Sequence, residues 1–182
     1  MQEFWCQVKE GHITRGYFQD FLNHGLTKDS SLLRRISDEP LIIDAVDGQE
    51  ILANATDMFA WIDSDFKNWG ADEPGRPSGE TKAVVYEMAK DGTFKQLFSS
   101  LESDVAKLCF TQAQIKGFVK KHRSWLRTDG YGTFFLFRSK GEFFVAIVYV
   151  YSGGLYVYVP RLGYSYVWYA EYRYRLVVPR LA

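Results

Sequence analysis

Tyrosines and arginines of the C-terminal half have the residue types and spacing of a surface that binds an anionic partner. Ten of the 12 tyrosines lie in residues 104–182. Tyrosine offers a ring on which a base can stack, and a nearby arginine offers the opposite charge to a phosphate. Nine residues form the predicted ligand-binding surface: Arg127, Tyr131, Tyr149, Tyr151, Tyr156, Tyr158, Arg161, Arg173 and Arg175.

The net charge of zero conceals two oppositely charged halves. Residues 1–103 carry 10 Lys/Arg against 18 Asp/Glu, a net charge of −8, and residues 104–182 carry 12 against 4, a net charge of +8. Charge asymmetry of this kind is typical of proteins with an anionic partner. A second interpretation is that the acidic half folds against the basic half, which would leave no open basic surface.

Three hypotheses for function follow from these residues. The leading one is a non-enzymatic binding or interaction module that uses a Tyr/Arg-rich sheet face, with nucleic acid or another polyanion as the partner. The second is a protein–protein or homo-oligomer interface on the same face, because Tyr, Trp and Arg also anchor interfaces. The third is an enzyme with a site around Asp63, Asp65, Arg127 and Asp129. Tyrosine ladders also serve purely as cross-strand packing.

The remaining reactive residues predict no catalytic, metal or cofactor site. The segment Asp63–Asn68 places oxygen ligands at alternate positions as a calcium loop does, but Lys67 interrupts the series and no terminal Glu follows in register. We therefore expect Asp63 and Asp65 to cap backbone amides. Cys6 and Cys109 are too far apart in the sequence for a paired redox or zinc motif.

The chain is expected to be one cytoplasmic globular domain over residues 1–182. Its N-terminus lacks the basic and apolar regions of a secretion signal. The longest apolar run, Phe143–Tyr151, is about half of what a membrane-spanning helix requires, so no membrane partner is predicted. A composition that is 47% hydrophobic and 17% aromatic is sufficient for one substantial core.

The elements that position the tyrosines are predicted to be strands. Val148 and Val150 alternate with Tyr149 and Tyr151, so a strand here has an aliphatic face and an aromatic face. Short turns between successive strands predict an antiparallel meander of four or five strands. The expected strands are 133–138, 142–151, 155–159, 164–169 and 171–178.

The first two thirds of the chain are predicted to be mainly helical, which gives an α+β fold with these helices packed against the C-terminal meander. Asp47-Gly48 favours a hairpin turn within residues 41–54, although residues 50–60 are also compatible with a helix. A strand is expected at 83–88 and a loop at 71–81. The expected helices are 14–24, 30–36, 58–69, 93–101 and 111–122, the last starting with a capping box of Thr111 and Gln114.

Four segments of the chain resemble an uncharacterised family of small bacterial proteins from uncultured lineages. They are Ile62–Gly70, Trp125–Phe137, Phe143–Ala146 and Val177–Pro179. The likeness extends from about residue 41 to the C-terminus. Since no activity, ligand or catalytic residue is established for that family, the resemblance implies no function.

Overall fold

A mixed β-sheet forms the centre of the chain, whose computed structural model describes residues 31–181. Residues from Leu32 onward form one compact unit. The strands are β1 (Leu33–Arg35), β2 (Leu41–Ile43), β3 (Phe59–Ile62), β4 (Thr81–Met88), β5 (Gly132–Ser139), β6 (Glu142–Tyr151), β7 (Gly154–Tyr158) and β8 (Arg175–Pro179). The α-helices of the described residues are α3 (Asp65–Asn68), α4 (Phe94–Ser99) and α5 (Gln112–Lys121), with 3₁₀ turns at Leu52–Asn54, Val105–Leu108, Arg123–Trp125 and Ala170–Tyr172.

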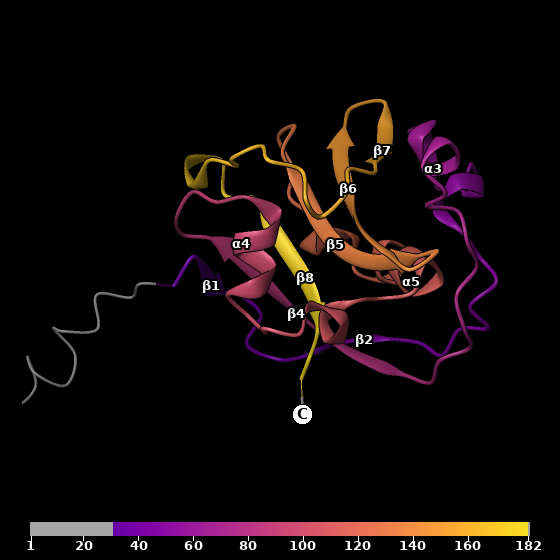
Figure 1. Cartoon of the computed structure of the whole chain (residues 1–182), viewed down its shortest axis with the longest axis horizontal. Coiled ribbons are helices and arrows are strands. Elements are labelled where there is room, and N and C mark those ends of the chain that lie inside the picture. The colour runs from indigo at the N-terminus through magenta and orange to yellow at the C-terminus, as the bar shows by residue number, and fades with distance from the viewer. Residues whose placement is uncertain (1–30, 182) are drawn as a thin grey trace, which may run out of the picture. The chain divides into compact units, whose positions relative to one another are not determined.

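The strand order combines local hairpins with long-range pairs. The order across the sheet is β1-β4-β8-β5-β6-β7-β3, and β2 also pairs with β4. Strands β5, β6 and β7 are joined by antiparallel hairpins, whereas β8 lies parallel to β5 and antiparallel to β4. Strand β3 adds a second parallel pair, alongside β7. Figure 1 shows β8 (yellow) between β4 and β5.

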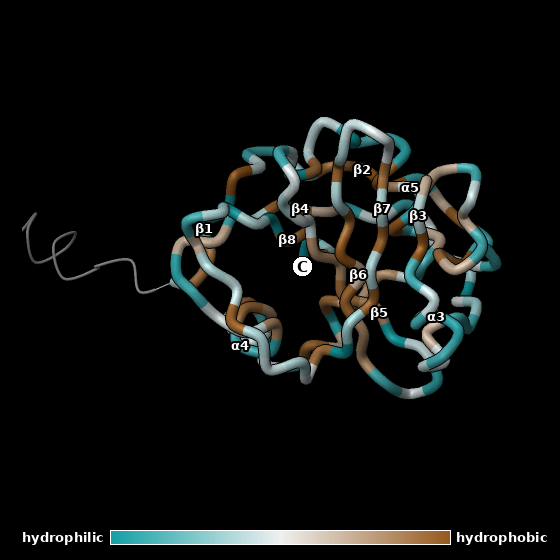
Figure 2. The backbone as a smooth tube through the Cα atoms, turned by 90° about the horizontal axis from the view of Figure 1, so that it is seen from above, coloured by the Kyte–Doolittle hydropathy of each residue, from teal (hydrophilic) through white to brown (hydrophobic). Residues whose placement is uncertain are grey.

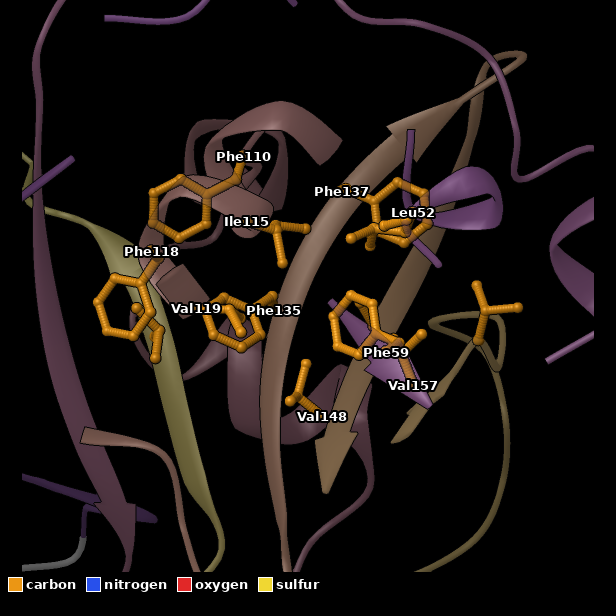
Figure 3. Close-up of a cluster of buried hydrophobic side chains, with 14 of the residues drawn as sticks. Leu52, Phe59, Phe110, Ile115, Phe118, Val119, Phe135, Phe137, Val148 and Val157 are labelled. Atoms are coloured by element: carbon orange, nitrogen blue, oxygen red, sulfur yellow. The ribbon is translucent and has the colours of Figure 1, made fainter. Parts of the chain in front are cut away.

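Both faces of the sheet are buried against hydrophobic side chains. Phe135 of β5 packs on the face covered by α5, where its ring centroid lies 5.4 Å from that of Phe118 (Figure 3). Phe134, its neighbour in the chain, points to the opposite face and meets Phe94 of α4 at 5.0 Å. Because successive side chains of a strand alternate, one strand contributes to two separate cores. Figure 2 shows hydrophobic residues along β5 and β6.

The two longer helices begin at capping boxes. The Thr111 hydroxyl accepts a hydrogen bond from the backbone N–H of Gln114, and the Gln114 side chain accepts one from the N–H of Thr111. Thr93 and Gln96 form the same arrangement at the start of α4. These bonds satisfy backbone donors that a helix N-terminus otherwise leaves without partners. The predicted helices 93–101 and 111–122 are confirmed, with slightly shorter bounds.

The predicted fold class is wrong. The fold is dominated by the mixed sheet, and the helices are too short and too few to form a layer against a C-terminal meander. After β7 the chain does not turn into another neighbouring strand. It crosses the sheet face, and β8 then enters between β4 and β5. The first part of the chain contributes strands as well, so the meander is one section of a larger sheet.

Two predicted helices are strands in the structure. Within the predicted helix 30–36, Leu33–Arg35 forms β1, with Leu33 buried and Arg34 paired with Glu87 of β4 at 2.9 Å. Within 58–69, Phe59–Ile62 forms β3, and only Asp65–Asn68 is helical. Both strands are short and pair with distant segments, so local residue spacing did not identify them.

Two predicted strand segments are irregular. Gly48 adopts the expected positive φ of 79°, and the Asp47 carboxylate accepts a hydrogen bond from the N–H of Gln49 at 2.9 Å. Residues 41–54 do not form the predicted hairpin, because β2 pairs with β4 and residues 52–54 form a 3₁₀ turn. Residues 164–167 are exposed and outside any strand.

Strands β4, β5, β6 and β7 confirm the predicted strands 83–88, 133–138, 142–151 and 155–159. Of the predicted strand 171–178 only residues 175–178 are extended, in β8, because Ala170–Tyr172 form a 3₁₀ turn. The predicted helix 14–24 lies outside the described residues. None of the helices within residues 31–181 is both long enough and apolar enough to cross a membrane.

Candidate ligand-binding pocket

A cavity of about 780 Å³ opens on the face of the sheet that carries α4, at the end formed by β6 and β7. Three parts of the chain enclose it: the sheet, the segment around α3, and the segment 160–174 that crosses the sheet face. The lining residues are mainly aromatic: Asp63, Trp69, Gly130, Tyr131, Ile147, Tyr149, Tyr151, Tyr158, Pro160, Arg161, Gly163, Tyr164, Trp168 and Tyr174. We call this cavity the aromatic pocket.

The alternation of strands β6 and β7 places tyrosines at the floor of the aromatic pocket. Val148 and Val157 belong to the core beneath α5, whereas Tyr149 and Tyr158 belong to the opposite side. The Tyr149 and Tyr158 rings meet edge to face at 5.4 Å, and the Tyr149 and Tyr151 rings stack at 5.7 Å. Such pairs add about 0.5–1.5 kcal/mol beyond area burial, so the rings hold each other in place.

The wall above this floor is formed by the segment 160–174. Trp168 is 7% exposed and packs at 5.0 Å against Tyr174 and at 4.9 Å against Phe134 of β5. Backbone hydrogen bonds between Trp168 and Gly92, at 2.9 and 3.1 Å, join this segment to the chain just before α4. The wall is therefore fixed to the sheet by both ring packing and main-chain bonds.

Two charged side chains line the aromatic pocket. The Asp63 carboxylate accepts hydrogen bonds from the backbone N–H groups of Asp65, at 3.0 Å, and Val159, at 3.4 Å. The Arg161 guanidinium forms an ion pair with Glu142 and lies 5.9 Å from the centroid of the Trp69 ring. Arg161 is therefore already neutralised, whereas Asp63 receives only backbone donors.

Burial further disfavours ionisation of three phenols of the aromatic pocket, those of Tyr149, Tyr158 and Tyr174. Loss of solvation raises the pKa of Tyr174 to about 12 and raises the pKa of Tyr149 further. The pKa of Tyr158 is also raised, first by burial and then by the negative potential of Tyr151 and Asp63. At neutral pH these hydroxyls therefore keep their hydrogens and can donate hydrogen bonds.

Several polar atoms around the aromatic pocket lack a partner in the protein. Within residues 31–181 no hydrogen bond reaches the hydroxyls of Tyr149, Tyr158 or Tyr174. The indole N–H of Trp168 is buried and is also without a partner in this part of the chain. The three hydroxyls are therefore available to water or to a ligand, whereas the Trp168 indole N–H is shielded from both.

The structure brings together five of the nine residues predicted for ligand binding. Tyr131, Tyr149, Tyr151, Tyr158 and Arg161 line the aromatic pocket. A sixth predicted residue, Tyr156 of β7, does not line the pocket. Its ring packs against that of Tyr151 at 5.1 Å and against that of Trp61 at 6.2 Å.

The three other predicted arginines do not reach the aromatic pocket. Arg127 lies behind Tyr131, with its guanidinium carbon 5.3 Å from that ring, and pairs with Asp129 at 3.1 Å. Arg175 donates to the backbone carbonyls of Trp125 and Leu126.

Arg173 is exposed, in a left-handed conformation with φ of 51° that ends the 3₁₀ turn before β8. The alternation with tyrosine that the sequence shows around it therefore does not continue as a regular strand. The four predicted arginines therefore have different contact partners and do not form a continuous basic surface.

The residues of the enzyme hypothesis form two separate pairs. Asp63 accepts from the N–H of Asp65, as expected for a residue that caps a backbone amide, whereas Asp65 accepts from the Asn68 side chain at 3.0 Å and caps no backbone amide of the described chain. Arg127 pairs with Asp129, whose side chain is 74% exposed. No hydrogen bond or ion pair within the described residues joins the two pairs, so they do not assemble one polar centre.

Cys109 and His122 make contacts that point to a role in the fold and not in catalysis. Burial raises the pKa of the Cys109 thiol to about 12, so it stays protonated and is a poor nucleophile. The His122 ring nitrogen Nε2 lies 2.8 Å from the backbone oxygen of Ile42, at the end of α5. Among the described residues no group of three His, Cys, Asp or Glu side chains is arranged to hold a metal ion.

Nine of the 14 residues that line the aromatic pocket were not predicted as ligand-binding residues. Trp69, Tyr164, Trp168 and Tyr174 line it but were not among the predicted residues, and Asp63 was considered only as a cap or an acid. The density of aromatic residues between 164 and 174 was the available signal. It did not show that this segment folds back over the sheet.

A comparison of the chain with family models, curated proteins and solved structures finds no match. The argument for function therefore rests on the geometry and chemistry of the aromatic pocket.

Proposed function

We propose that this protein is a non-enzymatic binding protein that holds a small organic ligand in the aromatic pocket. The observation that carries the proposal is a cavity of about 780 Å³ walled by rings from segments far apart in the sequence. Pockets for small molecules are concave, mostly apolar and about 300–1,000 Å³ in volume, with a few polar groups that orient the ligand. The aromatic pocket has each of these properties.

The lining chemistry favours a ligand with an apolar or flat surface. Ring faces of tyrosine and tryptophan contact such surfaces over a large area at a low cost in conformational entropy. The unpartnered hydroxyls of Tyr149, Tyr158 and Tyr174 supply hydrogen-bonding groups within the same cavity. Within residues 31–181 the charged residues of the lining are Asp63 and Arg161, which have separate partners, so the arrangement supports binding without chemical conversion.

The contacts of the arginines support a small ligand more than a polyanion. Arg127 and Arg161 are each paired with a carboxylate, and Arg175 is engaged with backbone carbonyls. Binding of nucleic acid depends on several cations that contact successive phosphates. We therefore expect fluorescence anisotropy of a labelled oligonucleotide to show no saturable binding at about 50 or 200 mM salt. Tight binding that weakens steeply with salt would restore the polyanion hypothesis.

Filling the mouth of the aromatic pocket tests the proposal. Gly163 lines the pocket, and a Cβ atom built there meets no other atom within 4 Å. Gly163→Trp is therefore expected to place an indole in the mouth without strain and to weaken ligand binding by about tenfold or more. The measurement is a titration with the neutral fluorescent dye N-phenyl-1-naphthylamine.

Gly79→Trp is the matched control. Gly79 also has open space around its Cβ position and lies in the segment before β4, outside the lining. Saturable dye binding by the wild type and by Gly79→Trp, with loss in Gly163→Trp, is the expected result. Equal dye binding by all three proteins would remove the proposal.

The exposed rings at the rim support a second candidate, an interface between copies of the chain. Tyr164, Tyr166 and Tyr169 are 52%, 45% and 45% exposed, which is unusual for side chains of this size. Tyr and Trp are also common anchors of protein interfaces. Sedimentation velocity in the same series separates the two: self-association that Gly163→Trp abolishes, without dye binding by the wild type, would favour the interface.

A further inference from the structure

The charge of the aromatic pocket is set by one carboxylate. Asp63 lines the cavity and has no ion-pair partner in the described chain. Arg161 also lines it, but its charge is balanced by Glu142. The neutral phenols add no charge of their own. A ligand group beside Asp63 therefore meets a local negative charge that no ion pair of the described chain balances.

The ring faces add to this local negative charge. The face of an aromatic ring is the negative part of its quadrupole and attracts cations within about 6 Å of the ring centre. The protein itself uses two of the lining rings in this way: Arg127 lies 5.3 Å from the Tyr131 centroid and Arg161 lies 5.9 Å from that of Trp69. The other rings of the lining have no such cation from the described residues.

Aromatic faces and a carboxylate together match one class of ligand. An anion could accept from the phenol hydroxyls, but it would meet the repelling Asp63 carboxylate and ring faces, and the one cation among the described lining residues is the Arg161 guanidinium, which already pairs with Glu142. A neutral ligand would leave the Asp63 charge without a counter-ion in a partly dehydrated cavity. A cation with apolar substituents would satisfy both features at once.

We propose that the ligand of the aromatic pocket is an organic cation, a substituted ammonium compound whose charge lies among Tyr149, Tyr158 and Asp63. This inference rests on the proposed function, since it names the ligand class for the same site. The apolar substituents of the cation contact the rings, and the Asp63 carboxylate supplies the counter-charge.

Three probes of similar shape and different charge test the inference. Phenyltrimethylammonium is a cation, tert-butylbenzene is its neutral counterpart, and benzenesulfonate is an anion. Each is titrated into the full-length protein, and displacement of N-phenyl-1-naphthylamine is measured. The cation is expected to bind about tenfold more tightly than the neutral probe, and the anion more weakly than both.

A matched pair of variants locates the charge. Asp63→Asn keeps a side-chain oxygen that can accept from the N–H of Asp65, which preserves the turn before α3, but its amide nitrogen cannot replace the longer bond from the N–H of Val159. It is expected to weaken cation binding by about tenfold and to leave the neutral probe unchanged. Asp65→Asn is the control, because Asp65 bonds Asn68 and does not line the aromatic pocket.

The outcomes separate this inference from the proposed function. Tighter binding of the cation, lost in Asp63→Asn and kept in Asp65→Asn, supports it. Equal binding of the cation and the neutral probe, or equal effects of the two variants, overturns the inference while dye binding still supports the proposed function. Failure of all three probes to displace a bound dye also overturns it. The proposed function itself fails if the dye does not bind, or if it binds Gly163→Trp as tightly as the wild type.

Discussion

Replacement of Phe134 with alanine is expected to lower the free energy of unfolding by about 3–5 kcal/mol and to disrupt the aromatic pocket. Phe134 is fully buried in β5, and its ring lies 5.0 Å from Phe94, 4.9 Å from Trp168 and 5.2 Å from Tyr174. Its removal leaves a cavity beneath two residues of the pocket wall. Urea unfolding measures the loss of stability, and dye titration below the unfolding transition measures the loss of binding.

Phe135→Ala is the control for the position of Phe134. Phe135 is its neighbour in the same strand and is equally buried, but it faces Phe118 on the side of the sheet covered by α5. Its loss is expected to destabilise the fold by a similar amount, about 3–5 kcal/mol, and to leave dye affinity unchanged in the folded protein.

A third variant keeps the test informative if Phe134→Ala does not fold. Phe134→Leu retains most of the buried volume and removes the ring contacts with Trp168 and Tyr174, so it is expected to fold and to bind the dye more weakly. Equal dye affinities in Phe134→Leu and Phe135→Ala would show that Phe134 does not support the aromatic pocket.

Local patterns were sufficient to predict the elements whose hydrogen bonds are local. Helix α5 carries an apolar face of Ile115, Phe118 and Val119, and its first turn is closed by the side chains of Thr111 and Gln114. The hairpin between β5 and β6 turns at Lys140 and Gly141, both with positive φ. In each case the signal and the partner lie within a few residues of each other.

Long-range pairing explains why the sheet itself was not predicted. Strand β3 has four residues and pairs in parallel with β7, nearly one hundred residues later, so no turn signal connects them. Strand β8 lies between β4 and β5, although the tyrosine-rich segment that precedes it in the sequence indicated a continuing meander. A strand's partner is chosen by the whole fold, which periodicity within the strand does not reveal.

The aromatic pocket also combines features that local sequence patterns predict with contacts that depend on distant parts of the chain. Alternation in β6 predicted correctly that Tyr149 lies on the face opposite Val148. It did not predict that Trp168 covers this face, because Trp168 is held by bonds to Gly92 far away in the sequence. Nor could composition show that Arg161 would be paired with Glu142, the contact that leaves Asp63 as the uncompensated charge.

Substitution of Gln112 tests how much a buried polar side chain of α5 stabilises the fold. Gln112 is 2% exposed; its side-chain oxygen accepts from the N–H of Leu52 at 3.0 Å, and its amide donates to the backbone oxygen of Glu73 at 3.0 Å. Gln112→Met keeps the length of the side chain but removes both bonds. Because the Leu52 N–H is buried, we expect a loss of about 2–4 kcal/mol in the free energy of unfolding, measured by urea denaturation.

Gln96→Met provides the same substitution at an exposed helical position. The Gln96 side chain accepts from the N–H of Thr93 in the capping box of α4, where water can replace the lost bond. Gln96→Met is therefore expected to lower the free energy of unfolding by about 1 kcal/mol or less. Hydrogen exchange of the Leu52 amide should accelerate in Gln112→Met only. Equal costs for the two variants would contradict the idea that Gln112 joins α5 to the segments at Leu52 and Glu73, since burial is what distinguishes the two glutamines.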